Sequence, residues 1–350
     1  MIINIFTHFS GFNYGAFLQA LGSQYLIQNL YKDANIFYGP FMPLGNRFIE
    51  YKSRLISPSS LSTLVNIGII RHLSSYRKNF LPSSTPYTLS SPSALFIYGA
   101  DEILNVTSQF FSDKFFPTFN NLNRSFYLSA SLGCADYFNF TTLQSEILSS
   151  LLQQKRFTVR DLHSASVISQ ITGFSPPITC DPAFYLPLWE LASVYELSVK
   201  SIIHCPFILI YGHHLPSSSL DQIRRIAAQE DLKIVSYPYN NSISTMRIPA
   251  LTPFELLALF KISKYVVTNM FHGVVLSSIL NPRYAFIPNN LRSKKLSFVV
   301  KEYNIGPKYW HDTCQSPLRH FLSEIDLESL NAHVQYSRDL HESIVATCRL

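Results

Sequence analysis

The sequence predicts an α/β protein with two Rossmann-like, doubly wound domains that face a cleft. Short runs rich in β-branched and aromatic residues alternate with stretches whose apolar residues recur every three or four positions, a pattern typical of βαβ units. This alternation starts again after about residue 200, and 350 residues exceed what one small core usually supports. We therefore expect domains at 1–190 and 201–325, followed by a C-terminal helix at 326–350.

The first domain opens with a βαβ unit. Its predicted strands are 2–8, 34–39, 94–99, 125–131 and 156–160, and its predicted helices are 14–31 and 161–171. An insert at 49–84 interrupts this order with basic, apolar and serine residues. Two readings of the insert stay open: it packs over the cleft, or it contacts a membrane or a lipid-linked substrate as an amphipathic surface.

The second domain repeats the alternation after a crossover at 187–205. The predicted strands are 207–212, 233–239, 265–268 and 283–288, and the predicted helices are 219–230, 252–263 and the stretch that follows His272. The C-terminal helix could pack on either domain.

Composition narrows the class of protein. Hydrophobic residues make up 47% and charged residues 14% of the chain, against about 25% charged in ordinary soluble domains, so a large core can form. The net charge is +6, but the basic residues form no arm typical of nucleic-acid binding. We expect no nucleic-acid partner, and a positive cleft would suit an anionic small molecule.

The N-terminus and the cysteines indicate where in the cell the protein works and whether it binds a metal. The N-terminus lacks the pattern of a signal peptide, and no apolar run is long enough to span a membrane. We expect a cytoplasmic protein, with attachment to the inner face of the membrane left open. The five cysteines are widely spaced and form no C-x-x-C pair. We expect free thiols, no metal and no cofactor.

Candidate site residues lie where predicted strands end, because ligands of doubly wound domains bind at the carboxyl ends of the strands. In "TNMFHG" (268–273), His272 would stand in the first helical turn, Gly273 would let a ligand approach the backbone, and Asn269 precedes them. An imidazole there can bind an anion or transfer a proton, or it can simply cap its own helix.

Three more strand ends carry polar residues. "GFNYGA" (11–16) contains Asn13, Tyr14 and Gly15 but lacks the third glycine of a dinucleotide fingerprint, so these residues either line the cleft or only shape a turn. In "GADEILN" (99–105), Asp101 and Glu102 could cap a helix or act as a base toward a sugar hydroxyl.

Arg160 ends a strand and precedes Asp161, so it forms either a surface ion pair or a bidentate contact with a carboxylate or phosphate in the cleft. Asp181 stands before a proline and indicates a turn. His213 and His214 form a strand-end pair that lacks partners at metal-ligand spacing.

Taken in order, these segments resemble the polysaccharide pyruvyl transferase family. The matching pieces are "NYGAFLQALGSQYL", "FIYGADEILN", "YLSASLG", "FTVRDLHS", "CDPAFYL" and "TPFELLALFKISKYVVTNMFHGVVLSSIL", which run from about Phe12 to Pro288. The resemblance implies a fold similar to B-type glycosyltransferases. It also implies transfer of a pyruvyl group from phosphoenolpyruvate to a sugar of a surface polysaccharide or its lipid-linked precursor, with formation of a cyclic ketal and release of phosphate.

The resemblance implies a role for His272, and the chemistry of phosphoenolpyruvate suggests roles for other residues. His272 would bind phosphoenolpyruvate and is a candidate proton donor, while Asp101 or Glu102 would activate the sugar hydroxyl. Arg160 and Arg292 would supply cations for the phosphate and carboxylate of the donor, with Arg283 as the rival to Arg292. Asn269 and Gly273 complete the predicted donor site.

The chain departs from the family in two motifs. It has Met270 where the family usually has serine, and Ala100, Glu102 and Leu104 in a motif that usually reads "GSDQ-x-WN". Two other functions therefore stay open. One is a B-type glycosyltransferase that uses a nucleotide sugar, for which Glu255 is the candidate ribose ligand, and the other is an inert relative that binds a glycan.

Overall fold

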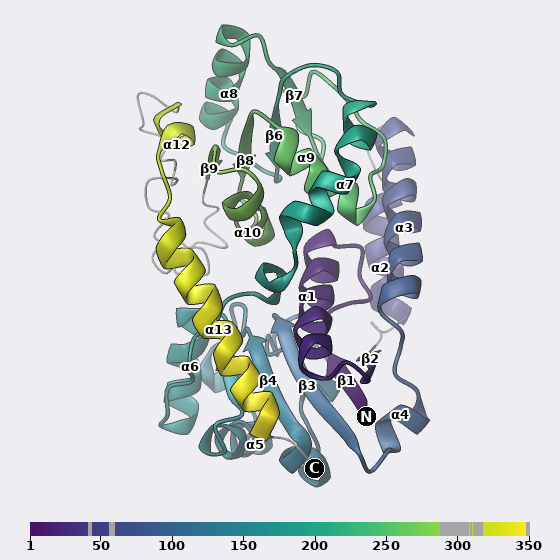
Figure 1. Cartoon of the computed structure of the whole chain (residues 1–350), viewed down its shortest axis with the longest axis vertical. Helices are drawn as coiled ribbons and strands as arrows, with labels where there is room; N and C mark the ends of the chain where they lie inside the picture. The colour runs from purple at the N-terminus through teal and green to yellow at the C-terminus, as the bar shows by residue number, and fades with distance from the viewer. Residues whose placement is uncertain (41–43, 56–59, 288–307, 309, 311–317, 348–350) are drawn as a thin grey trace. The chain divides into compact units, whose positions relative to one another are not determined.

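The computed structural model describes residues 1–40, 44–55, 60–287, 308, 310 and 318–347. The chain folds into two compact units, each built on one parallel sheet (Figure 1). Unit 1 comprises Met1–Ser53, Leu73–Leu186 and Asn331–Leu350, and unit 2 comprises Arg54–His72 and Pro187–Leu330. The predicted α/β class with two Rossmann-like sheets is confirmed.

Unit 1 is a five-stranded sheet in the order β2-β1-β3-β4-β5, in which all neighbours are parallel. Its strands are β1(Ile2–Phe6), β2(Asn35–Gly39), β3(Ala94–Asp101), β4(Ser125–Ala130) and β5(Phe157–Val159). At the centre, Ile5 of β1 lies in register with Tyr38 of β2 and Ile97 of β3. The inner strands are nearly all buried, as expected for a parallel sheet that is covered on both faces.

Helices connect these strands and cover the sheet. They are α1(Tyr14–Leu30), α2(Leu44–Leu55), α3(Ser60–Phe80), α4(Pro86–Ser90), α5(Thr142–Gln153) and α6(Leu162–Thr172), with 3-10 turns η1(Asp113–Phe115), η2(Phe119–Arg124), η3(Tyr137–Asn139) and η4(Pro182–Tyr185). Helix α3 begins in unit 2 and ends in unit 1. Gly22 of α1 permits close packing on η4, because a Cβ at this glycine would lie 2.0 Å from the carbonyl oxygen of Pro182.

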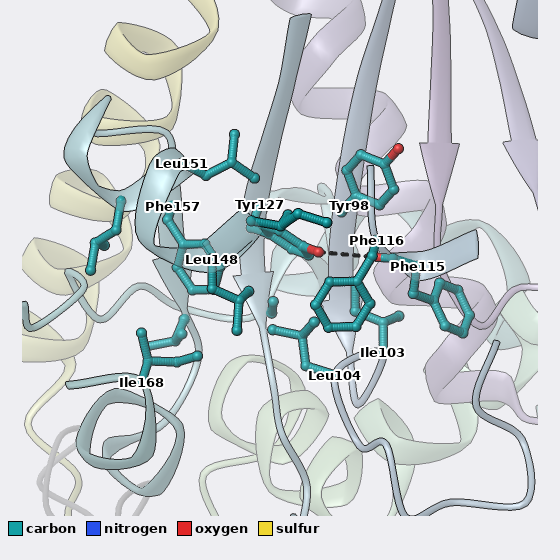
Figure 2. Close-up of a cluster of buried hydrophobic side chains, with 14 of the residues drawn as sticks. Tyr98, Ile103, Leu104, Phe115, Phe116, Tyr127, Leu148, Leu151, Phe157 and Ile168 are labelled. Atoms are coloured by element: carbon teal, nitrogen blue, oxygen red, sulfur yellow. Dashed lines mark hydrogen bonds between the residues drawn. The ribbon is translucent and has the colours of Figure 1, made fainter. Parts of the chain in front are cut away.

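One face of the unit 1 sheet carries a large aromatic and aliphatic core, shown in Figure 2. Tyr127 of β4 lies at its centre, between Tyr98 of β3 and Phe157 of β5, with ring centroids 5.3 and 4.7 Å away. The buried Tyr127 hydroxyl donates a hydrogen bond of 2.8 Å to the Phe115 carbonyl. This bond holds the long connection between β3 and β4 against the core, because a buried hydroxyl needs a partner.

The C-terminal helix α13(Leu327–Thr347) packs on unit 1, which answers the question that the sequence left open. The imidazole of His341 is fully buried and hydrogen-bonds both the Thr158 hydroxyl of β5, at 2.9 Å, and the Tyr185 hydroxyl, at 2.8 Å. The Ser337 hydroxyl accepts from the Cys180 backbone N–H at 2.9 Å. The helix thus supplies hydrogen-bond partners to buried polar groups of unit 1.

Unit 2 repeats the same strand order on a smaller scale, β7-β6-β8-β9, again fully parallel. Its strands are β6(Phe207–Tyr211), β7(Lys233–Ser236), β8(Tyr265–Thr268) and β9(Tyr284–Phe286), and its helices are α7(Leu188–Lys200), α8(Ser217–Gln229), α9(Pro253–Ile262), α10(Phe271–Leu280) and α12(Leu318–Leu322). Helix α7 packs along α9 (Figure 1). The strand predicted at 233–239 is shorter than expected and ends at Ser236.

Within the described residues, none of the helices combines the length and the apolar character that crossing a bilayer requires.

Candidate functional site

The strand order places the candidate residues of each unit at a switch point. In a doubly wound sheet, the loops that leave two neighbouring strands in opposite directions open a crevice at their carboxyl ends, and ligands bind there. In unit 1 the neighbouring strands are β1 and β3, and Asp101 ends β3. In unit 2 they are β6 and β8, and His213 and Asn269 directly follow them. Each unit therefore has its own candidate site.

Asp101 occupies an unusual backbone conformation at the end of β3. Its φ angle is +71°, in the left-handed region that residues other than glycine rarely adopt. Such conformations persist where the surrounding structure enforces them, and they are common at functional sites. One carboxylate oxygen of Asp101 accepts the backbone N–H of Glu102 at 2.9 Å, which fixes the side chain at the edge of the sheet.

Arg160 is the centre of an ionic cluster at this edge. It is only 4% exposed, and its guanidinium donates to Asp181 at 2.8 Å and to Asp101 at 3.4 Å. Burial alone would lower its pKa, but the carboxylates of Asp181, Asp101, Glu102 and Asp161 outweigh burial and raise it. Arg160 therefore stays protonated and holds two carboxylates in place.

Asp161, the expected ion-pair partner of Arg160, has a different role. Its side chain caps α6 by accepting the Ser164 N–H at 2.8 Å, and it accepts the Ser131 hydroxyl at 2.7 Å. The interpretation of Arg160 and Asp161 as a surface ion pair is therefore wrong, because Arg160 is buried and pairs with Asp181 and Asp101. Four carboxylates therefore act on the guanidinium of Arg160.

The remaining part of the unit 1 site is built by the loops after β3 and β4. Glu102 accepts the Asn105 amide at 3.3 Å, and Asn105 in turn lies 3.9 Å from the sulfur of Cys134. Gly133 has φ +63°, and a Cβ there would lie 2.5 Å from both Asn105 and Glu102. Only glycine lets the two loops approach this closely.

The "GFNYGA" segment shapes the start of α1. The Asn13 side chain caps the helix by accepting the Gly15 N–H at 2.9 Å, and Tyr14 is buried as the first helical residue. This geometry is the turn-shaping role that the sequence allowed for Asn13 and Gly15. The Phe12 N–H, just before the cap, donates to Glu50 of α2 at 2.8 Å.

In unit 2, hydrogen bonds join the loops that follow β6, β7 and β8. The Asn269 amide donates to the His213 carbonyl at 2.6 Å, and its oxygen accepts the His213 N–H at 3.3 Å. Asn241 donates to the Gly212 carbonyl at 3.2 Å. A Cβ at Gly212 would lie 2.3 Å from the Asn269 oxygen, so this contact depends on glycine. Asn269 therefore holds the shape of the site.

His272 stands in the first turn of α10, half-buried, as the sequence predicted. Thr268 is the last residue of β8. Its hydroxyl donates to the Tyr211 carbonyl at 2.7 Å and accepts the Met270 N–H at 3.1 Å. A Cβ at Gly273 would lie 2.0 Å from this hydroxyl. Gly273 thus lets the helix begin directly against the strand end. The positive end of the helix dipole points to the carboxyl edge of the sheet, where doubly wound domains usually bind their ligands.

The structure places Arg283 away from this edge and gives Glu255 a capping role. Arg283 precedes β9, and its carbonyl accepts the Val266 N–H near the start of β8, so it lies at the amino end of the sheet, opposite His272. Glu255 caps α9 by accepting the Thr252 N–H at 2.8 Å, and it also accepts the Ser198 hydroxyl at 2.6 Å. Arg292 lies outside the described residues.

Sequence reasoning missed two residues that lie beside the candidate residues. Asp181 was expected only to form a turn, yet it is fully buried and gives Arg160 its shortest ionic contact. His213 was considered only as half of a metal pair, yet it lies at the switch point, and its ring contacts that of Tyr239 with centroids 4.7 Å apart. Strand-end position was the available signal for His213. No local signal linked Asp181 to Arg160.

The described residues contain no group of three or more His, Cys, Asp or Glu side chains that could hold a metal ion.

Comparisons with known proteins bear on fold and family. The chain is similar to a UDP-GlcNAc 2-epimerase of Methanocaldococcus jannaschii, crystallised with UDP-GlcNAc and UDP, at 12% identity and a TM-score of 0.43, with 97% of this chain and 94% of that chain covered. It is also similar to the E. coli heptosyltransferase WaaC with ADP-2-deoxy-2-fluoro heptose, at 12% identity and a TM-score of 0.39, with coverage of 96% and 99%. No curated protein sequence matches the chain.

The sequence model of one family matches most of the chain. It is that of polysaccharide pyruvyl transferases, and the match covers residues 13–281, from the cap of α1 to the residue that follows α10. This range includes the ionic cluster of unit 1 and the His272 turn of unit 2. The chain belongs to the polysaccharide pyruvyl transferase family.

Proposed function

We propose that this protein transfers a pyruvyl group from phosphoenolpyruvate to a sugar of a surface polysaccharide or its lipid-linked precursor, with formation of a cyclic ketal. The observation that carries the proposal is the family match over residues 13–281, which includes both candidate sites. Each unit contributes chemistry suited to one substrate. Unit 2 suits the anionic donor, and unit 1 suits the hydroxyl-rich acceptor.

The groups at the N-terminus of α10 support a role for unit 2 in binding the donor. The phosphate and carboxylate of phosphoenolpyruvate favour a helix N-terminus and imidazole groups. His272 lies in the first turn of α10, and His213 lies at the neighbouring strand end. Asn269 holds the two loops together through both hydrogen bonds to His213. We assign His272 to donor binding and to protonation of the methylene carbon.

The carboxylates at the end of β3 support an acceptor role for unit 1. The guanidinium of Arg160 is shared by Asp181 and Asp101. We therefore propose that Arg160 acts through Asp101 as a positioning residue. Asp101 would accept a proton from a sugar hydroxyl, because a carboxylate within hydrogen-bond reach of a hydroxyl can act as its base. Glu102, the next residue, is the alternative base.

The proposed reaction balances in two steps. A proton from His272 adds to the methylene carbon, and a sugar oxygen bonds to the carbon that bears the phosphate while its proton passes to Asp101. A second hydroxyl of the same sugar then bonds to that carbon while its proton passes to His272, which gave up its own proton in the first step. Phosphate leaves with the electron pair of the broken C–O bond and takes up the proton that Asp101 accepted. The product is a cyclic pyruvate ketal and inorganic phosphate, and no redox partner is needed.

The glycosyltransferase alternative rests on Glu255 as a ribose ligand. Both oxygens of the Glu255 carboxylate accept hydrogen bonds that cap α9 and join it to α7. Because Glu255 has this structural role, we favour the pyruvyl transferase proposal. Titration with nucleoside diphosphates tests the glycosyltransferase alternative directly.

The first test is calorimetric titration of phosphoenolpyruvate and, separately, of nucleoside diphosphates. We expect wild type to bind phosphoenolpyruvate, and His272→Gln to bind it about 10- to 100-fold more weakly, the loss expected for one hydrogen bond to a charged group. His204→Gln is the matched control, since this exposed histidine precedes β6 at the opposite edge of the same sheet.

Each other outcome selects a different function. Nucleotide binding in the absence of phosphoenolpyruvate binding would replace the proposal with the glycosyltransferase. If neither ligand binds to folded wild-type protein, the inert glycan-binding relative is favoured. Equal phosphoenolpyruvate affinity in both histidine variants would remove His272 from the donor site.

A further inference from the structure

We propose that α2 and α3 each carry an exposed stripe that docks on an anionic lipid bilayer. Each of these two helices presents a continuous stripe of exposed apolar and cationic side chains. The exposed stripes contain no carboxylate. The described residues of this surface are Phe48, Ile49, Lys52 and Leu55 on α2, and Leu64, Ile67, Arg71 and Lys78 on α3.

The stripe on α2 has the spacing of one helical face. Phe48 is 69%, Ile49 50% and Leu55 41% exposed, and Lys52 is exposed between them. These positions are separated by one, three and three residues, so their side chains point the same way. Exposed aromatic and branched aliphatic side chains that line one helix face indicate a binding surface.

The opposite face of α2 is anchored to unit 1. The Tyr51 ring packs edge-on against Phe12 with centroids 4.6 Å apart, and Glu50 accepts the Phe12 N–H at 2.8 Å. Asn46 donates to the Gln109 carbonyl. The helix is therefore held by its inner side chains, and exposure of its outer stripe is a property of the folded unit.

Helix α3 repeats the arrangement over a longer stretch. Leu64 is 63% and Ile67 39% exposed, and Arg71 and Lys78 are exposed farther along the same face. Steps of three, four and seven residues keep these side chains on one side of the helix. The apolar pair precedes the cationic pair, which gives the helix the amphipathic character of interfacial helices.

Charge distribution identifies the partner as anionic. Residues 44–80 contain six Lys and Arg against one Glu, a net charge of +5 in a chain whose total is +6. The single acidic residue, Glu50, is used in the inner contact with Phe12. Anionic lipid surfaces attract such segments by about 1 kcal/mol for each cation, while exposed Phe, Ile and Leu side chains enter the boundary between headgroups and acyl chains.

The location of this surface connects it to the proposed acceptor. Helix α2 is hydrogen-bonded to the loop that follows β1, and that loop belongs to the switch point of unit 1. A surface bound to lipid would bring this loop to the plane where a lipid-linked sugar is presented. The choice of a lipid-linked acceptor rests on the proposed function, whereas membrane binding itself does not.

The test is sedimentation of the full chain with vesicles of phosphatidylglycerol and phosphatidylcholine, compared with vesicles of phosphatidylcholine alone. We expect binding to the anionic vesicles only. Reversing the charge at Lys52, Arg71 and Lys78 to Glu should weaken partitioning by at least about 100-fold, given the contribution expected for each cation. The matched control carries Lys32→Glu, Lys114→Glu and Lys233→Glu, three exposed lysines elsewhere, and should bind as wild type does.

A second pair of variants tests the apolar contribution. Phe48→Ser with Leu64→Ser should reduce binding at high salt, where charge attraction is screened, whereas Val194→Ser with Leu197→Ser should not. The control residues are 75% and 81% exposed on α7. Loss of binding in both charge-reversed proteins alike would show attraction by net charge only and overturn the proposal.

Two further outcomes would also overturn it. Wild-type protein that fails to sediment with anionic vesicles would exclude the lipid surface. Dimers in analytical ultracentrifugation that dissociate in the Phe48→Ser, Leu64→Ser variant would show that the stripes form an interface between two copies. Phosphoenolpyruvate titration of the same variants separates these failures from failure of the proposed function, because none of the changed residues belongs to the candidate sites.

Discussion

At the scale of single residues, the cluster at the end of β3 contains side chains with two different roles. Some hold the cluster together, and one is the proposed base. Arg160 and Asp181 are buried and joined at 2.8 Å, whereas the Asp101 side chain is 16% exposed and more weakly bound to Arg160 at 3.4 Å. The buried pair is the fixed part of the cluster. The more exposed carboxylate, Asp101, is therefore the one to which we assign the proposed contact with a substrate hydroxyl.

This difference predicts how Asp101 and Glu102 respond to substitution. Asp101→Asn should lower kcat about 10²- to 10⁴-fold, the usual contribution of a general base, and should leave phosphoenolpyruvate affinity unchanged. Steady-state kinetics with a sugar acceptor, together with donor titration, would measure both effects. Glu102→Gln is the comparison. A normal kcat in Asp101→Asn and a depressed one in Glu102→Gln would assign the base to Glu102.

The same cluster shows what sequence could and could not predict at this scale. Asp101, Arg160 and His272 were identified because each ends a strand or begins the helix that follows one, and strand ends can be recognised from local pattern. Asp181 was missed because its partner lies 21 residues away along the chain, and the Asp-Pro sequence indicates only a turn. The partner of a buried ion depends on how segments pack, which periodicity does not reveal.

At the scale of elements, the junction between β8 and α10 depends on one glycine. Gly273 lies in the first turn of α10, and a Cβ there would lie 2.0 Å from the Thr268 hydroxyl, which must hold the end of β8. The junction cannot widen easily, because Thr268 is buried and hydrogen-bonded on both sides. The proposed donor site therefore depends on close backbone packing as well as on His272.

Gly273→Ala should destabilise the protein by about 1–3 kcal/mol, the usual cost of forcing extra volume into a packed site, and should weaken phosphoenolpyruvate binding. Gly45→Ala on α2 is the control, since no atom lies within 4 Å of its added methyl group, and alanine favours helix over glycine. Thermal unfolding of both variants measures the stability change. Equal melting temperatures for Gly273→Ala and wild type would show that the junction relaxes at no cost.

Most elements could be predicted from the sequence, because parallel strands buried on both faces stand out as short apolar runs. The details that could not be predicted are tertiary. Strand β7 ends at Ser236, three residues before its predicted end, and the stretch 49–84 forms two helices on either side of a gap in the described residues. Their exposed apolar stripes can be recognised only once the structure shows which face of each helix is covered by the rest of the protein.

At the scale of the whole molecule, α13 joins the far end of the chain to unit 1. Its His341 is fully buried, and burial lowers its pKa to about 3. The imidazole is neutral in the folded unit and hydrogen-bonds Thr158 and Tyr185. An unfolded chain carries an ordinary histidine with a pKa of about 6.5. The two states therefore bind different numbers of protons in mildly acidic solution.

Stability should fall as the pH decreases below about 6.5, because the unfolded chain takes up a proton that folded unit 1 excludes, and it should be independent of this group above that pH. The expected loss is about 2 kcal/mol between pH 6.5 and 5. Thermal unfolding across this range measures it. His341→Gln should lose this part of the slope, while His163→Gln, at a partly exposed position, should keep it. An unchanged slope in His341→Gln would assign the acid sensitivity to other groups.

The discontinuity of unit 1 has a consequence for the order in which the protein is made. Residues up to Leu186 leave the ribosome first, but Ser337 and His341 follow only after the whole of Pro187–Leu330 has been synthesised. Until then, the Cys180 N–H and the hydroxyls of Thr158 and Tyr185 lack the partners that α13 supplies. The sheet of unit 1 therefore stays incompletely covered until unit 2 has been synthesised and α13 has followed it. We expect nascent unit 1 to need a chaperone most during this interval.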